Sequence, residues 1–276
     1  MSAGAGVVVH LAPHADDECI GAPATLMALR DHGWRVVNVT CSLGRPDEAD
    51  RRRAEVTEAC RRARFESLVL DPPLGDPLSG AEVGPSTRAL ADRLAPVLVE
   101  LDPRILVAPS PHDRHRGHEV VGRAALTLGA GLGDGDGDRA VGGRRLWLWG
   151  LWADLPLPTA ALGFAEDRLD EVLDALAAHA GELDRNDYRR LVRGRAEMNA
   201  ALGPERVFGF GSAGTSVPFA ELLCELGRAG GTWRLGRPRW LDPAMPVGEL
   251  GDKAVDAWLE SPSITDRFGP PGYRDR

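Results

Sequence analysis

The stretch VVVHLAPHADDE, residues 7–18, decides the fold, because an apolar run ends abruptly and an acidic loop with a histidine follows at once. Val7 to Leu11 is rich in valine, and continuous apolar segments of this length are typical of buried parallel strands. The loop from Pro13 to Glu18 then carries one histidine and three acidic residues. The stretch therefore predicts a buried strand with a functional loop at its carboxyl end.

Similar apolar runs recur further along the chain, at Arg35 to Cys41, Ser67 to Leu70 and Ile105 to Ala108. Helical patterns lie between and after them, over roughly residues 19–32, 48–64, 86–101 and 117–130. This alternation predicts an α/β fold with a Rossmann-like parallel sheet and helices on both faces. Ligand sites in such sheets lie outside the carboxyl ends of the strands.

Composition excludes several classes of protein. The chain has 276 residues and a formal net charge of −8, and its arginine-rich segment at 51–64 is interleaved with glutamates. Without a basic stripe, an acidic chain is a poor nucleic-acid binder. No apolar run is long enough to span a bilayer, and no signal peptide is evident. We expect a cytoplasmic protein with no nucleic-acid or membrane partner. Formation of a homo-oligomer is compatible with the sequence.

Three of the seven histidines lie within one short segment, His112-Asp113-Arg114-His115-Arg116-Gly117-His118. This segment follows the apolar run at 105–108, just as His14 follows the first run. The two loops converge at one edge of the sheet if their strands are neighbours. A solvated loop rarely needs so many histidines, so the segment favours a functional site.

A two-histidine, one-carboxylate set of His14, Asp17 and His118 suits a catalytic zinc site with an open position for water. Asp16 is then left beside the metal as a candidate base, and His115 as a candidate acid. A plainer alternative for the acidic pair is helix capping, which aspartate does well. The plainer alternative for the histidines is that they are ordinary polar residues at the start of a helix.

The two motifs together resemble those of the LmbE-like, PIG-L family of metal-dependent N-acetylglucosaminyl deacetylases. The family signature A-H-P-D-D-E corresponds to Pro13–Glu18, and its later motif D-x-H-P-D-H-x-x-x-G corresponds to Asp113–Gly122. The likeness covers about the first 130 residues in motif order and strand placement. It implies that His14, Asp17 and His118 bind Zn²⁺, that Asp16 is the general base and that His115 stabilises the oxyanion.

The same resemblance implies two residues that contact the substrate, and the sequence departs from the family motifs at two positions. An R-x-x-E helix and a loop aspartate of the family correspond to Arg52 and Asp76, which would contact sugar hydroxyls. Ala15 replaces a proline, and Gly117 stands where the family has an aspartate between the two histidines. We expect Asp113 to substitute for that carboxylate as the outer partner that orients an imidazole.

The resemblance implies a hydrolase that removes the N-acetyl group from a 2-acetamido sugar (GlcNAc) conjugate, in a bacterial pathway such as aminoglycoside or glycopeptide biosynthesis. Fe²⁺ or another divalent ion fits the ligand set as well as Zn²⁺ does. Two alternatives stay open: an amidase of mycothiol-type thiol conjugates, and a non-catalytic sugar-binding module. Trp147, Trp149 and Trp152 offer either a stacking platform for a sugar or core packing.

The later part of the chain is less regular. The segment from Gly129 to Gly143 has the composition of a flexible linker, and a strand is expected at Leu146–Trp149. Two helical patterns follow, at about 166–180 and 185–202. We expect residues 1–150 to form a Rossmann-like metal-binding catalytic core. Residues 151–276 are expected to pack on it, shape the substrate pocket and complete one integrated domain.

Overall fold

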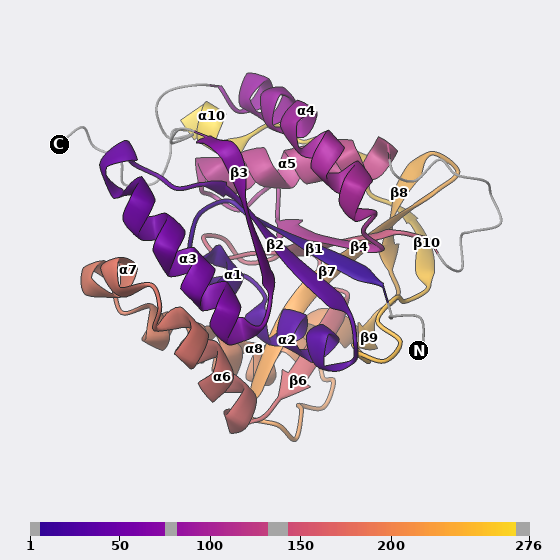
Figure 1. Ribbon diagram of the computed structural model, residues 1–276. Helices are drawn as coiled ribbons and strands as arrows, with labels where there is room; N and C mark the ends of the chain where they lie inside the picture. Colours follow the sequence, from indigo (N-terminus) through magenta and orange to yellow (C-terminus); the bar gives the residue numbers. More distant parts are fainter. Residues whose placement is uncertain (1–5, 75–81, 132–142, 269–276) are drawn as a thin grey trace.

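The computed structural model describes residues 6–74, 82–131 and 143–268 (Figure 1). The first five strands are β1 (Val7–Ala12), β2 (Arg35–Ser42), β3 (Glu66–Leu74), β4 (Ile105–Pro109) and β5 (Arg145–Trp149). The helices that alternate with them are α1 (Asp17–Ile20), α2 (Pro23–Asp31), α3 (Ala49–Ala63), α4 (Val83–Leu101) and α5 (Arg116–Gly131), with a short 3-10 helix at Pro46–Glu48. The predicted α/β alternation is confirmed.

These five strands are parallel and lie in the order β3-β2-β1-β4-β5. β1 pairs with β2 on one side and with β4 on the other, so the strand order reverses at β1. The crevice at the carboxyl ends of β1 and β4 is the place where open α/β sheets bind ligands. The two histidine loops follow these neighbouring strands and therefore meet there.

The C-terminal part extends the same sheet with antiparallel strands. Its elements are β6 (Ala160–Phe164), α6 (Glu166–Leu176), α7 (Ala180–Arg185), α8 (Tyr188–Phe208), β7 (Phe219–Ala229), β8 (Thr232–Gly236), β9 (Arg239–Trp240), β10 (Leu250–Ala254), α9 (Asp256–Leu259) and α10 (Ile264–Phe268). β7 pairs with β5 and β8, and its first residues pair with β6. The sheet is therefore mixed, because one edge is antiparallel rather than parallel. The division of the chain at residue 150 stays a prediction.

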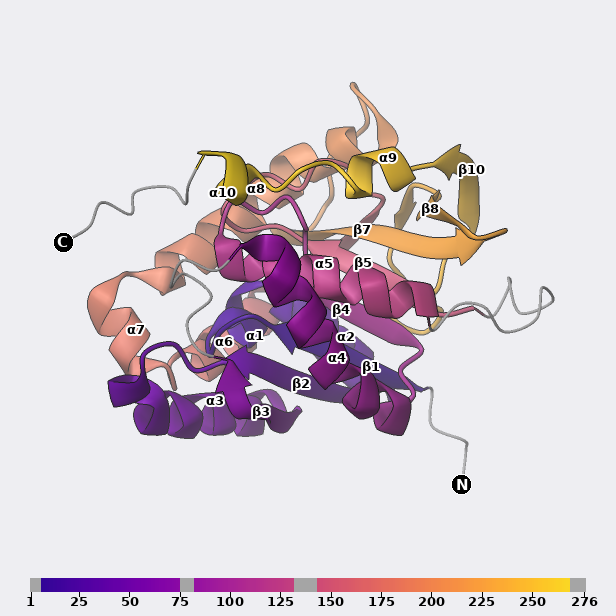
Figure 2. The same cartoon turned by 90° about the horizontal axis from the view of Figure 1, so that it is seen from above.

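Buried side chains form one apolar layer on each face of the sheet. Val8 belongs to the layer under α2, α3 and α6, whereas Val9 belongs to the layer under α4 and α5, because successive strand side chains point to opposite faces. Figures 1 and 2 show these helices on the two sides of the strands. None of the helices in the described ranges is both long and apolar enough to cross a bilayer.

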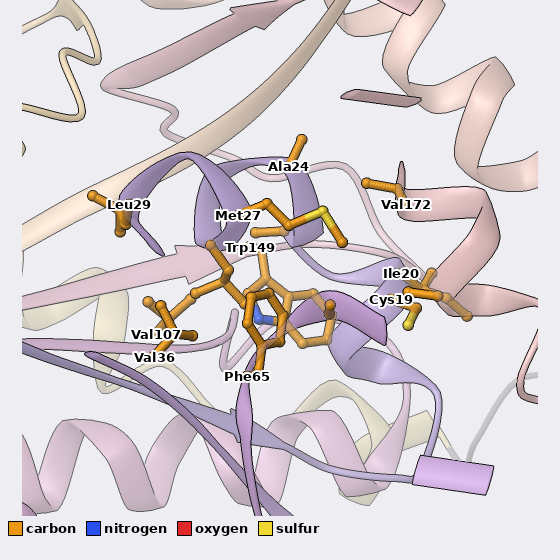
Figure 3. Packing of buried hydrophobic residues seen from close by; sticks show 14 of the residues in the cluster. Cys19, Ile20, Ala24, Met27, Leu29, Val36, Phe65, Val107, Trp149 and Val172 are labelled. Atoms are coloured by element: carbon orange, nitrogen blue, oxygen red, sulfur yellow. The ribbon is translucent and has the colours of Figure 1, made fainter. Parts of the chain in front are cut away.

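The first layer also anchors the loop that follows β1. Trp149 from the end of β5 is 1% exposed and belongs to this layer, of which Figure 3 shows a part. A Cβ on Gly21 would lie 2.7 Å from Cε2 of this indole, so only glycine lets the turn after α1 approach so closely. The core therefore fixes the position of the α1 turn. The four cysteines are buried and form no disulfide.

Candidate active site and metal centre

The loop after β1 brings two of the predicted ligands side by side. His14 lies in the loop, and Asp17 is the first residue of α1. Oδ2 of Asp17 lies 3.3 Å from Nδ1 of His14 and accepts a hydrogen bond of 2.9 Å from the His14 backbone N–H. This local hydrogen bond orients the carboxylate toward the imidazole.

The first turn of α5 supplies the third predicted ligand. Nε2 of His118 lies 3.5 Å from Oδ1 of Asp17, and its Nδ1 lies 2.7 Å from Oδ2 of Asp113. Asp113 is fully buried, and its Oδ1 also accepts hydrogen bonds from the backbone N–H groups of Leu151 (3.0 Å) and Ala153 (2.7 Å). Asp113 is thus fixed in place and orients His118, as carboxylates behind metal-binding histidines commonly do.

The donor atoms are close enough together to hold one ion. Ligand atoms of His14, His115 and His118 all lie within 4.8 Å of one another, and the Asp17 carboxylate contacts both His14 and His118. Imidazole nitrogen and carboxylate oxygen are the donors that Zn²⁺ accepts. His115, which the sequence predicted as an acid or as a group that stabilises the oxyanion, lies in the same cluster and is a further candidate ligand.

The electrostatics of this cluster also suit a cation. Burial raises the pKa of Asp17, but His118 and His14 outweigh it and hold that pKa below its usual range. Burial lowers the pKa of His118, but Asp17 and Asp113 outweigh it and raise that pKa. A metal ligand must be deprotonated, so protons compete with an ion for the imidazole of His118. Metal affinity should therefore weaken as the pH falls.

Asp16 has a backbone conformation that aspartate rarely adopts, with φ of 143° and ψ of −23°. Such strain costs on the order of 1–3 kcal/mol and is concentrated at functional sites. Burial, followed by the charges of Asp17, Glu182 and Glu18, raises the pKa of Asp16 well above its usual range, and Arg52 partly offsets this. A carboxylate with a raised pKa is a stronger base than an ordinary one.

His115 lies just before α5 and stacks on Trp152, with ring centroids 5.5 Å apart and an interplanar angle of 25°. Burial, together with His14 and His118, lowers the pKa of His115 to about 2, so its imidazole is neutral. Its Nδ1 atom is buried and has no hydrogen-bond partner among the described residues. Trp152 is 48% exposed, whereas Trp147 and Trp149 are core residues. Trp147 and Trp149 therefore serve core packing, and the alternative that they stack on a sugar is wrong.

Arg52 lies close to Asp16 but is already paired. It is 9% exposed, and its guanidinium forms an ion pair with Glu182 of α7. Glu182 also binds Arg185, which in turn donates a hydrogen bond of 2.7 Å to the Tyr188 hydroxyl. A contact between Arg52 and a sugar stays a prediction. Asp76, the other predicted sugar contact, lies outside the described residues.

The C-terminal part contributes residues that sequence reasoning missed. Glu182 faces Arg52, and His179 is fully buried against Glu18. His179 lies directly before α7. Nothing in the sequence indicates its partner, because the two residues are 161 positions apart.

Comparison with known proteins gives a match to one family model and a shared fold. Residues 9–128 match the family model described as PIG-L: GlcNAc-PI de-N-acetylase. No curated protein sequence matches the chain. N,N'-diacetylchitobiose deacetylase from Pyrococcus horikoshii is 19% identical, with a TM-score of 0.60 over 80% of this chain and 83% of that one.

Two other solved structures extend the comparison. A deacetylase of the teicoplanin biosynthesis pathway is 16% identical, with a TM-score of 0.59 over 79% of this chain and 98% of that one. The 4-carboxy-2-hydroxymuconate hydratase of Pseudomonas putida KT2440 is 18% identical, with a TM-score of 0.60 over 81% and 97%. At such identities these likenesses concern the fold, and a fold alone does not determine the reaction. The family match is more specific, because residues 9–128, over which the chain is similar to the PIG-L model, contain both histidine loops.

Proposed function

We propose that the protein is a metal-dependent hydrolase that removes the N-acetyl group from a 2-acetamido sugar conjugate. The observation that carries this proposal is the convergence of His14, Asp17 and His118 beside the strained Asp16, at the carboxyl ends of β1 and β4. The family match and the deacetylases among the similar structures support an N-deacetylation. Zn²⁺ is the proposed ion, with Fe²⁺ or another divalent metal as a substitute.

In this proposal His14, Asp17 and His118 hold the ion, and Asp113 keeps His118 in the orientation that binding needs. A divalent ion in such a site supplies Lewis acidity, which polarises a carbonyl group and lowers the pKa of water. The neighbouring side chains must then move the proton and stabilise the oxygen that becomes negative. Asp16 and His115 are the groups assigned to these two tasks.

Asp16 accepts a proton from the attacking water, and its raised pKa favours that role. The same carboxyl group then gives the proton to the departing amine nitrogen, which leaves acetate and a free amino sugar. His115 is neutral and has no extra proton to release, so we assign it as an N–H donor to the developing oxyanion. Of the two roles expected for His115, this proposal keeps oxyanion stabilisation and gives the acid role to Asp16.

The substrate class is inferred from an exposed aromatic side chain beside the site and from the similar structures. Trp152 is half exposed and lies against His115, so a sugar ring stacked on it would place its acetamido group near the histidines. Deacetylases of teicoplanin and of the A40926 pseudoaglycone share the fold. We therefore propose a small-molecule GlcNAc conjugate from a pathway such as aminoglycoside or glycopeptide biosynthesis.

The test is acetate release from a panel of N-acetylglucosaminides, measured on metal-stripped protein before and after one equivalent of Zn²⁺ is added. We expect release that depends on the metal. Asp16→Asn should lower kcat by about 10²–10⁴-fold and keep the metal, since this is the usual contribution of a general base. Asp154→Asn removes a carboxylate that is 82% exposed and should leave kcat unchanged.

Other outcomes would redirect the proposal. Cleavage of mercapturate-type amides without any acetate from sugars would indicate the thiol-conjugate amidase. Tight binding of metal and sugar with no cleavage across the panel would indicate a binding module. Turnover of Asp16→Asn at the wild-type rate would remove Asp16 from the mechanism.

A further inference from the structure

A second polar cluster lies next to the proposed metal site but outside it. Glu18, Cys19 and His179 are fully buried or nearly so, at 0%, 1% and 0% exposure. Nε2 of His179 donates a hydrogen bond of 2.5 Å to Oε1 of Glu18. The cluster therefore joins the loop after β1 to the turn between α6 and α7. The buried carboxylate of Glu18 needs hydrogen-bond partners, because removing a charge from water is costly.

The carboxylate of Glu18 is a bridge whose two oxygens have different partners. Oε2 accepts a hydrogen bond of 3.1 Å from the backbone N–H of Asp16. Oε1 accepts from His179 and also from the thiol of Cys19, whose sulfur lies 3.6 Å away. Any rotation of the carboxylate that breaks the first contact therefore disturbs the second. The imidazole fixes the orientation in which the other oxygen meets Asp16.

The contact with Asp16 matters because of the conformation of that residue. Its φ of 143° is unfavourable for aspartate, so surrounding contacts must hold it. The Asp16 side chain is 8% exposed, and a buried backbone N–H without a partner is itself costly. The hydrogen bond to Glu18 satisfies that N–H only while the strained conformation is kept. The hydrogen bond from the Asp16 N–H to Glu18 thus helps to set the direction in which the Asp16 side chain points.

His179 is in turn held by its own backbone. Its N–H donates to the Leu176 carbonyl (3.0 Å), and its carbonyl accepts from the Leu183 N–H (3.0 Å). The N–H of Gly181 donates to Oε1 of Glu55 in α3, at 3.0 Å. The end of α6 and the start of α7 are therefore fixed against α3. His179 lies outside residues 9–128, so the family domain receives this support from the C-terminal part.

We propose that His179 is a positioning residue, which acts through the Glu18 carboxylate to hold Asp16 in the backbone conformation that aims its side chain at the reacting atoms. This inference rests on the proposed function, in which Asp16 is the base. The same three side chains also have the composition of a metal site. We favour the positioning role because both Glu18 oxygens already accept hydrogen bonds, one of them directly from the imidazole.

The experiment compares His179→Leu with His179→Gln, which keeps an N–H donor of similar reach. We expect His179→Leu to lower kcat by about 10- to 100-fold, as loss of an outer partner commonly does, with KM and metal content unchanged. His179→Gln should recover most of the loss. His32→Leu is the matched control, because His32 is exposed at the end of α2 and should change nothing.

A second measurement does not depend on activity. Hydrogen exchange at the Asp16 amide, followed by NMR, should be faster in His179→Leu than in the wild type and near normal in His179→Gln. If His179→Leu does not fold, Glu18→Gln replaces it, because an amide side chain has one acceptor oxygen and cannot serve both donors. It should also lower kcat and speed the exchange.

Two results would overturn the proposal. Wild-type kcat and wild-type amide exchange in a folded variant would show that the hydrogen-bond chain does not position Asp16. Loss of one metal equivalent per chain in His179→Leu would make the cluster a metal site instead. A wild-type protein that releases no acetate would overturn the proposed function, whereas the amide exchange would still test the chain from His179 to Asp16.

Discussion

Asp113 is the residue on which the orientation of His118 depends. Its carboxylate is fully buried and divides its two oxygens between the imidazole and two backbone N–H groups. Asp113→Asn keeps an acceptor for the backbone but cannot accept a second hydrogen bond at the other position. We expect the variant to fold and its metal affinity to fall by about 10- to 100-fold. Competition with a chelator of known affinity measures this.

The control for this variant is Asp154→Asn, whose carboxylate is largely exposed and lies 4.0 Å from the guanidinium of Arg206. Equal metal affinity in Asp113→Asn and the wild type would mean that His118 needs no orienting partner. Asp113 also bears on Gly117, where the family has an aspartate. His118 already has a buried carboxylate at Nδ1, so it does not depend on one at position 117.

Single residues also show what the sequence could and could not predict. His14, Asp17 and His118 were predicted as a set because each follows a recognisable strand, and parallel neighbours bring their carboxyl ends together. Arg52 was predicted as a sugar contact, but its ion pair with Glu182 joins positions 130 residues apart. Pairing across such a distance depends on the packing of α3 against α6 and α7, which no local pattern indicates.

At the scale of elements, the break between α1 and α2 shows how tertiary contacts override a helical pattern. The sequence predicted one helix over residues 19–32, whereas the structure interrupts it at Gly21 and Ala22. Pro23 is the first residue of α2, a position where its missing N–H costs nothing. Glu221 of β7 then accepts hydrogen bonds from the next two N–H groups, of Ala24 (2.9 Å) and Thr25 (2.7 Å).

Glu221 therefore caps α2 from a distant strand, and its removal should destabilise the fold. Glu221→Ala leaves two N–H groups at the helix start without their acceptor. We expect the free energy of unfolding to fall by about 1 kcal/mol, typical of a lost N-terminal cap. Urea denaturation measures this difference, with Glu249→Ala as the control because its carboxylate is 87% exposed. Equal losses in the two variants would show that the cap has no particular role.

The strands of the C-terminal part were the least predictable elements. β7 lies between β5 and β8 and has a nearly continuous run of buried residues from Phe219 to Gly227. A strand covered on both faces shows no alternation of polar and apolar residues, so its sequence does not reveal whether it runs parallel or antiparallel. The helices α3 and α5 were predicted to within a few residues because each presents one apolar stripe to the sheet.

At the scale of the whole molecule, the proposed metal would join two segments that are far apart in the sequence, the loop after β1 and the start of α5. His14 and Asp17 follow β1, whereas His118 lies in the first turn of α5 after β4, about 100 positions later. An unfolded chain cannot present these ligands together, so an ion that binds the native site stabilises the fold by mass action. The stabilisation is about 2.7 kcal/mol when the free ion is at 100 times its Kd.

For a chain of this length that free energy corresponds to a rise in Tm of about 5 °C, from the usual unfolding entropy per residue. We expect Zn²⁺ to produce this rise in metal-stripped wild-type protein, measured by differential scanning calorimetry. His118→Ala should lose it, because two ligands remain and the buried carboxylates of Asp17 and Asp113 lose their shared partner. Asp16→Asn should keep it, because Asp16 is proposed to move protons and not to bind the ion. A full rise in His118→Ala would place the stabilising ion elsewhere, and the buried cluster of Glu18, Cys19 and His179 would then be the first site to examine.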